Sequence, residues 1–321
     1  MHIPDGFLDA KTAIATAVFS VTGLGTALRH ARQHLQSREI PLVGLTAAFI
    51  FVAQMLNFPV AGGTSGHLIG ATLAMVLLGP SVAIIVMSSV LIIQAAIFAD
   101  GGLLALGANI FNMAFVAPVT GYVIYKSMRR FLRDIRGQLI SASVASWCTT
   151  VIASAFCAGE LAWSGIAAWN IVFPAMLGIH AIIGVGEGLI TMLTLSAIAK
   201  TRPELLTDTS IRTNGKETNP ALMYSAVMIL GLLLLIAPFA SRLPDGLDRV
   251  AQSLGFETKK IELRGFSTPL KDYRIFGIES SPLSTIAAGI TGAGVVFAFS
   301  FLLARVLVPK KNNVNNSRPS I

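Results

Sequence analysis

Residues 81–99 read SVAIIVMSSVLIIQAAIFA, a stretch without a single charged side chain. A run of about 20 apolar residues is long enough to cross the ~30 Å hydrocarbon core of a lipid bilayer as a helix. Inside the bilayer a helix is favoured, because it satisfies its own backbone hydrogen bonds where no water is available. The stretch therefore predicts a transmembrane helix, and similar runs recur along the whole chain.

The composition agrees with this prediction. Of the 321 residues, 54% are hydrophobic and only 12% are charged, and the mean hydropathy is +0.71. A soluble domain needs about a quarter of its residues charged, so a soluble enzyme is excluded. The formal charge of +8 does not indicate a nucleic-acid partner, because the basic residues are scattered between apolar segments. We expect most of the surface to face the lipid bilayer.

The apolar runs predict an all-α, polytopic membrane protein with about nine transmembrane helices. Their expected bounds are 9–28, 41–57, 66–79, 81–99, 104–126, 138–158, 171–199, 221–241 and 284–305. The third, Gly66 to Gly79, is too short to span the bilayer untilted. Pro80 suits the first position of the following helix, so we expect these two helices to form a tight hairpin.

Lysine and arginine in the connecting segments predict the orientation. Sixteen of the 24 basic residues lie in alternate connections, which the positive-inside rule places in the cytoplasm. Seven more lie in one long loop, and long loops are exempt from that rule. We therefore expect the N-terminus outside and the C-terminus inside.

Composition also divides the chain into four parts. We expect a seven-helix membrane core over 1–200, a cytoplasmic linker over 201–220, a two-helix accessory unit over 221–308 and a disordered tail over 309–321. The accessory unit contains an outer loop over 242–283. Because Pro244-Asp245-Gly246 precedes an amphipathic helical turn that ends at Gly255, we expect an ordered cap in this loop.

Missing motifs exclude several functions. The Gly215-Lys216 pair is followed by Glu217 and lacks the first glycine of a phosphate-binding loop, so the chain alone is not expected to hydrolyse ATP. The sequence also lacks the H-E-x-x-H and G-x-S-x-G patterns of metalloproteases and serine hydrolases. We predict a protein that is not an enzyme and has no resident cofactor.

The first two residues form a pattern that could bind metal. If Met1 begins the mature chain, its α-amine, the amide of His2 and the His2 imidazole Nδ1 can close two chelate rings around one ion. A fourth nitrogen would complete a square plane, the geometry diagnostic of Ni(II) or Cu(II). His67 is the other histidine on the expected outer side. The alternative is an ordinary disordered terminus, against which the rigid turn Ile3-Pro4-Asp5-Gly6-Phe7 argues.

The remaining histidines are weaker candidates. His30 and His34 share a helix face but lie among arginines at the expected cytoplasmic end of the first helix. His180 and Glu187 lie about two turns apart inside the seventh predicted span, where ionisable residues face a bundle interior or a pathway. For these two we expect a hydrogen-bonding role, either with one another or behind the metal ligands.

Several motifs of the first 200 residues have the form of a known family. They are MHIPDGFL at 1–8, GGTSGHL at 62–68 and DGGLLALGAN at 100–109, followed by Asn112-Met113. With these motifs the chain resembles the nickel/cobalt substrate-binding components of energy-coupling factor transporters, the CbiM/NikM type. Residues 244–256, with TPL at 268–270 and PLST at 282–285, resemble the accessory NikN/CbiN-like PDGLE unit of those systems, here fused to the C-terminus.

The resemblance implies uptake of a divalent cation, bound near the outer face by Met1, His2 and His67. Gln94, Asn109, Asn112, His180 and Glu187 match further positions of the family pattern, where either support of the ligands or hydrogen bonding between helices is expected. The implied partners are a transmembrane coupling protein and cytoplasmic ATP-binding cassette ATPases, and the implied location is the cytoplasmic membrane of a prokaryote.

Nickel is the expected substrate and cobalt the second choice, since a planar four-nitrogen site suits low-spin Ni(II). Two other classes are disfavoured. A self-sufficient secondary transporter would be expected to bury charged residues in several spans, and Glu187 is nearly alone. A membrane metal sensor would need a cytoplasmic output module larger than any of the expected inner segments.

Overall fold

The computed structural model describes residues 1–206, 227–241, 243–261, 268–275, 277–278 and 280–308. Within these ranges seven helices are long and apolar enough to cross a membrane. They are Ala10–His34, Ser37–Met55, Pro80–Phe98, Leu106–Arg129, Ile135–Trp163, Trp169–Thr201 and Pro282–Leu307. The predicted all-α, polytopic membrane fold is therefore confirmed.

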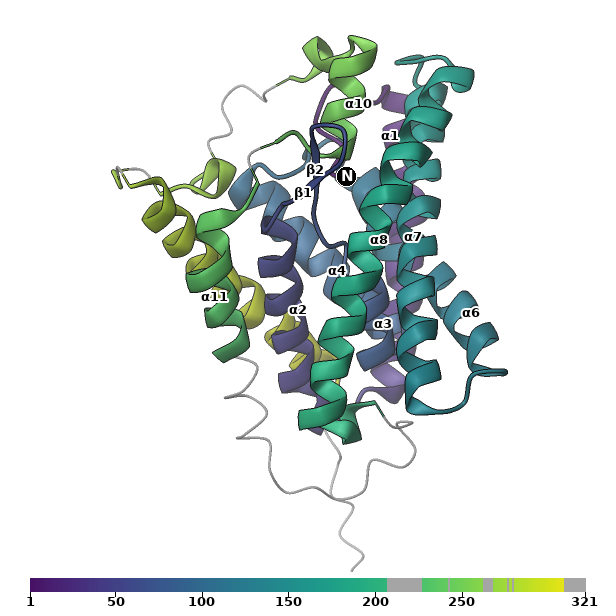
Figure 1. The fold of residues 1–321 in the computed structure, drawn as a ribbon, viewed down its shortest axis with the longest axis vertical. Helices are drawn as coiled ribbons and strands as arrows, with labels where there is room; N and C mark the ends of the chain where they lie inside the picture. The colour runs from purple at the N-terminus through teal and green to yellow at the C-terminus, as the bar shows by residue number, and fades with distance from the viewer. Residues whose placement is uncertain (207–226, 242, 262–267, 276, 279, 309–321) are drawn as a thin grey trace, which may run out of the picture.

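The main elements follow one another as α1 (Ala10–His34), α2 (Ile40–Met55), β1 (Phe58–Val60), β2 (Thr64–Gly66), α3 (Ala71–Leu78), α4 (Pro80–Ile93), α5 (Leu106–Asn109), α6 (Ala117–Arg129), α7 (Ile135–Trp163), α8 (Trp169–Thr201), α10 (Gly246–Leu254) and α11 (Ser281–Leu307). Helix α4 continues as the π-helical turn η2 (Gln94–Phe98), and η3 (Ile110–Val116) links α5 to α6. Short turns are η1 (Ser37–Glu39), η4 (Pro203–Leu205), η5 (Leu232–Ile236), η6 (Ala237–Phe239), η7 (Glu257–Lys259) and η8 (Lys271–Tyr273). Helices α7 and α8 run side by side, and α11 lies along α2 (Figure 1).

The third predicted span is wrong in its bounds. Only its first residue, Gly66, belongs to an antiparallel hairpin, in which Pro59 of β1 pairs with Ser65 of β2, and the helix α3 begins only at Ala71. The reason is local, because Gly70 adopts a positive φ angle of 79°, outside the helical region, directly before α3. His67 consequently lies on an extended segment rather than at the end of a helix.

The expected number of nine spans also differs from the seven that the described residues contain. Helix α3 has 8 residues and is about 12 Å long, too short to cross the hydrocarbon core. The eighth predicted span, 221–241, is described only from residue 227, where a shorter apolar helix covers Val227–Ile236. Pro80 does occupy the start of α4, as predicted. Most of the predicted linker, from residue 207, and the tail from 309 lie outside the described residues.

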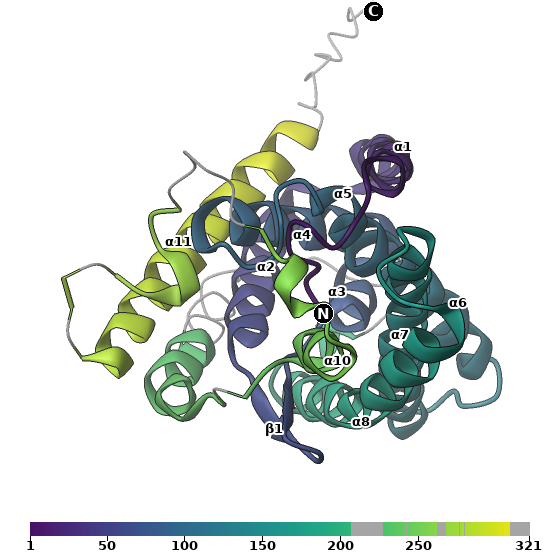
Figure 2. The same ribbon diagram turned by 90° about the horizontal axis from the view of Figure 1, so that it is seen from above.

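The N-terminal segment is built into one end of the bundle. Viewed from above, the N-terminus lies near the middle of the molecule, among α2, α3, α4 and α10 (Figure 2). The side chains of Ile3 and Phe7 are fully buried. A segment pinned by two buried apolar side chains cannot be the disordered terminus that was the alternative reading. The predicted helix in the C-terminal loop is present as α10, which begins after Asp245 and ends at Gly255 in the left-handed conformation.

Candidate metal centre

Asn109 fixes the main chain directly after His2. Its side-chain oxygen accepts a hydrogen bond from the Ile3 amide at 2.7 Å, and its amide nitrogen donates to the Ile3 carbonyl at 3.0 Å. Gly102 also donates its amide to that carbonyl, at 2.9 Å. Three hydrogen bonds on one residue therefore hold the backbone beside the His2 amide.

Asp5 anchors the same segment and was missed by the sequence reasoning. Its carboxylate accepts hydrogen bonds from the amides of Leu103, Leu104 and Ala105 at 2.8–3.2 Å. The contact is so close that a Cβ on Gly102 would lie 2.1 Å from an Asp5 oxygen, so this position requires glycine. The available signal was an aspartate in a Pro-Asp-Gly turn together with a second glycine-rich turn at residues 101–102.

The N-terminal amine lies beside His67. The Met1 nitrogen is 2.8 Å from His67 Nε2, and both residues are buried. His67 Nδ1 is 3.1 Å from the Leu68 carbonyl oxygen, which can only accept, so Nδ1 carries the proton and Nε2 keeps its lone pair. Metal–nitrogen bonds of about 2.0 Å at right angles place neighbouring nitrogens about 2.8 Å apart. The two nitrogens therefore have the spacing of adjacent ligands in a square plane.

His2 is held between two acceptors. Its Nδ1 lies 3.2 Å from Asp100 Oδ1, and its Nε2 lies 3.3 Å from the side-chain oxygen of Gln94. Its ring stacks on that of His67, with the centroids 5.0 Å apart. A ring nitrogen that donates a proton to a carboxylate has no lone pair for a metal. The Asp100 contact must therefore be released before Nδ1 can act as a ligand, while Gln94 can keep holding Nε2.

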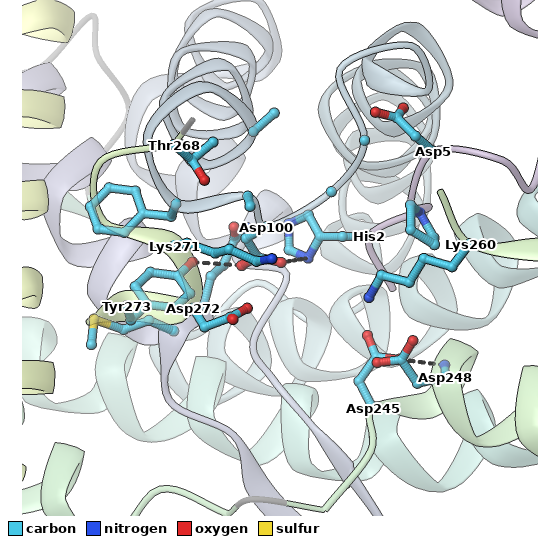
Figure 3. Close-up of a pocket in the computed structure, with 18 of the residues that line it drawn as sticks. His2, Asp5, Asp100, Asp245, Asp248, Lys260, Thr268, Lys271, Asp272 and Tyr273 are labelled. Atoms are coloured by element: carbon cyan, nitrogen blue, oxygen red, sulfur yellow. Dashed lines mark hydrogen bonds and ion pairs between the residues drawn. The ribbon is translucent and has the colours of Figure 1, made fainter. Parts of the chain in front are cut away.

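Tyr273, from the C-terminal part of the chain, is hydrogen-bonded to both acceptors of His2, Asp100 and Gln94. Its hydroxyl donates to Asp100 Oδ2 at 2.5 Å and accepts from the Gln94 amide at 3.3 Å. Figure 3 shows the resulting chain of contacts from Tyr273 through Asp100 to His2. Burial alone raises the pKa of Asp100, but the neighbouring His2 and the Tyr273 hydrogen bond outweigh it and leave the pKa below its usual value.

Asp245 holds the amine from the other side. Its Oδ2 accepts from the Met1 amine at 2.8 Å, while its Oδ1 accepts from the Asp248 amide and so caps the start of α10. Burial opposes the charge of Asp245, but the positive amine and His67 hold its pKa below the usual value. The sequence analysis placed Asp245 in a turn and assigned it no role at the metal.

Both imidazoles of the site favour the neutral form. Burial, the positive amine and His2 lower the pKa of His67 to about 3. Burial also lowers the pKa of His2, against the opposing effect of Asp100. Neutral imidazole is the form that binds a metal, because its lone pair is free.

Glu187 and His180 have separate hydrogen-bond partners. The Glu187 carboxylate accepts from the amides of Ile69 at 2.6 Å and Gly70 at 2.9 Å, directly before α3. It thereby holds the segment that carries His67. His180 Nδ1 bonds to the Met176 carbonyl at 2.8 Å in its own helix. The His180–Glu187 bond that was one of the expected alternatives is therefore replaced by these contacts.

Asn112 belongs to a different part of the bundle. Its amide donates to Glu160 Oε2 at 2.7 Å and so links η3 to α7. The structure thus brings Gln94, Asn109, His180 and Glu187 around Met1, His2 and His67, and brings Asn112 to Glu160.

Two cavities meet at these residues. The larger, of about 890 Å³, is open to the outside and is lined by His2, His67, Asp100, Asp245, Asp248 and Tyr273, among others (Figure 3). The smaller, of about 10 Å³, is lined by Met1, His67, His180, Asp245 and Gly246, among others. Within the described part of the chain, no group of three or more His, Cys, Asp or Glu side chains is arranged to hold a metal.

Comparison with known proteins identifies the family. The model of the cobalt uptake substrate-specific transmembrane region, CbiM, matches residues 2–205, and the PDGLE domain matches 219–309. A putative fused nickel transport protein, NikMN, of Archaeoglobus fulgidus is 36% identical over 95% of this chain and 98% of its own length. A probable fused nickel transport protein, LarMN, of Lactiplantibacillus plantarum is 31% identical over 88% of this chain and 91% of its own length.

A solved structure agrees with these relatives. The crystal structure of a transition metal transporter is 33% identical, covers 66% of this chain and 96% of its own, and superposes with a TM-score of 0.58. The chain therefore belongs to the CbiM family of cobalt uptake transmembrane regions and carries a PDGLE domain at its C-terminal end.

Proposed function

We propose that this transport protein captures a divalent nickel ion at the predicted outer face of the membrane. The ligands are the Met1 amine, the amide and Nδ1 of His2, and His67 Nε2. The observation that carries the proposal is the 2.8 Å separation of the amine and His67 Nε2 in a buried position, since this is the spacing of adjacent ligands in a square plane.

Nickel is preferred to cobalt for two reasons. A planar set of four nitrogens, one of them a deprotonated amide, suits Ni(II). Two relatives that match 95% and 88% of this chain are described as fused nickel transport proteins, one putative and one probable. Copper would bind such a site more tightly still, so discrimination against copper depends on its availability.

Uptake in this proposal requires partners. The sequence lacks a phosphate-binding loop, so cytoplasmic ATP-binding cassette ATPases and a transmembrane coupling protein supply the energy. Co-purification of an ATPase with the chain from native membranes supports this arrangement. Metal uptake by the purified chain alone in proteoliposomes contradicts it and favours a secondary transporter.

The ligand set is tested by equilibrium nickel binding and the visible absorption spectrum. The intact protein is expected to form a yellow complex of planar type, because the nitrogen ligands produce a strong planar field. His2→Ala, His67→Ala and a chain with two extra residues before Met1 should each lose this spectrum and bind at least about tenfold more weakly.

The extended chain is the most informative of these variants. It keeps both imidazoles and moves the amine two residues away from its place beside the His2 amide, so a fall in affinity identifies the amine as a ligand. Undiminished binding by this variant would place the metal elsewhere, with His180 and Glu187 as the next candidates.

A further inference from the structure

Asp245 stands between the outside and the buried amine. It lines both the open cavity of about 890 Å³ and the small pocket of about 10 Å³, whereas Met1 lines only the small one. The Asp245 side chain is 16% exposed, whereas the Met1 side chain is only 2% exposed. An ion that enters through the open cavity therefore reaches the Asp245 carboxylate before it reaches the amine.

The two oxygens of Asp245 have different tasks. Oδ1 caps α10 through the Asp248 amide, which fixes the position of the carboxylate. Oδ2 contacts the Met1 amine at 2.8 Å, so an ion bound to this oxygen would lie next to the nitrogen that must replace it. Carboxylate oxygen is also a ligand that hydrated divalent cations accept readily.

The charges suggest that Asp245 acts on rates more than on affinity. In the metal-free chain it faces a protonated amine of charge +1. In the proposed chelate it faces a divalent cation combined with one deprotonated amide, which is again +1. The carboxylate thus stabilises both end states to a similar extent, while it attracts the free dication during entry and exit.

We propose that Asp245 is a handover ligand for the metal, an inference that rests on the proposed nickel site. The incoming ion exchanges one water molecule for Asp245 Oδ2. It then exchanges this oxygen for the Met1 amine, whose proton passes to water. Because the same contact assists the reverse path, Asp245 speeds both binding and release.

The test is the kinetics of nickel exchange in the full-length chain, reconstituted in lipid nanodiscs and followed by absorption in a stopped-flow instrument. Asp245→Asn removes the charge, and asparagine is an equally good cap for α10. We expect its association and dissociation rate constants each to fall by about tenfold, the lower end of the range for electrostatic guidance, with Kd changed by less than about threefold. Asp245→Ser, which also preserves the cap, is the second variant if the first does not fold.

Asp9→Asn is the matched control. Asp9 is the aspartate that caps α1 by accepting from the Thr12 amide, so this change removes the same charge from the same kind of position. Its rate constants should match those of the unchanged chain. The proposal is overturned if Asp245→Asn leaves both rate constants unchanged, if it raises dissociation alone, or if Asp9→Asn slows exchange equally. Failure of the proposed function is a distinct result, in which the unchanged chain itself binds no nickel.

Discussion

At the level of single residues, His67 shows how burial prepares a ligand. An exposed histidine has a pKa near 6.5, whereas burial and the positive Met1 amine lower the pKa of His67 to about 3. Nε2 therefore keeps its lone pair across the physiological range, and protons compete for the site at the amine and the His2 amide instead.

This shift predicts how acid affects the metal-free protein. Between pH 6.5 and about 3 the unfolded chain binds a proton at His67 and the folded chain does not, so stability falls as pH falls through this window. His67→Asn should reduce the loss of thermal stability between pH 7 and pH 4. His30→Asn, at an exposed histidine, is the control. Unfolding curves in detergent at several pH values measure the effect, and an identical acid dependence in His67→Asn and the unchanged chain would contradict it.

At the level of elements, the buried carboxylate of Glu187 accepts hydrogen bonds from the amides directly before the short helix α3. The hairpin β1–β2 and the extended segment that follows it leave the amides of Ile69 and Gly70 without helical partners, and Glu187 of α8 accepts from both. Ser146 of α7 also donates to Glu187, at 3.4 Å. The position of His67 therefore depends on contacts of its own segment with Glu187 of α8, which Ser146 of α7 also contacts.

Glu187→Gln tests this dependence. Glutamine offers only one acceptor oxygen to two amides, and an unsatisfied buried N–H costs about 1–3 kcal/mol. We expect destabilisation of this size and roughly tenfold weaker nickel binding, since displaced supports of ligands typically weaken metal sites by 10–100-fold. Glu160→Gln, at the buried glutamate that pairs with Asn112, is the control for loss of a buried carboxylate. Equal losses of nickel affinity in both variants would show that Glu187 has no particular role at the site.

At the level of the whole molecule, the C-terminal part of the chain closes over the site of the N-terminal part. Main-chain hydrogen bonds join Ser65 to Pro244, Ile261 to Asp5 and Leu270 to Ile97, at 2.8–3.0 Å. Helix α11 packs along α2 on the flank of the bundle. The PDGLE part of the chain thus contacts the two segments that carry the proposed ligands, Met1 to Asp5 and Ser65 to His67.

Deletion of residues 221–321 separates binding from uptake. The four proposed ligands all lie in the part that remains, so equilibrium nickel binding should persist. Uptake into cells should fall by about tenfold, because the truncated chain lacks Asp245 and Tyr273. The effect is measured as cellular nickel content, compared at equal membrane levels of the two proteins. Undiminished uptake would contradict the prediction.

The sequence by itself determined the membrane class, the bounds of most long helices and the presence of α10, since these follow from apolar runs and capping residues that are close together in the chain. It also singled out Met1, His2 and His67, because chelate chemistry can be read from residue types. Only the tertiary structure decided that Asp245 and Tyr273 reach the same place, for 244 positions separate Met1 from Asp245 and no local pattern links them. It likewise showed that the third predicted helix begins only at Ala71, because Gly70 adopts a left-handed conformation directly before it.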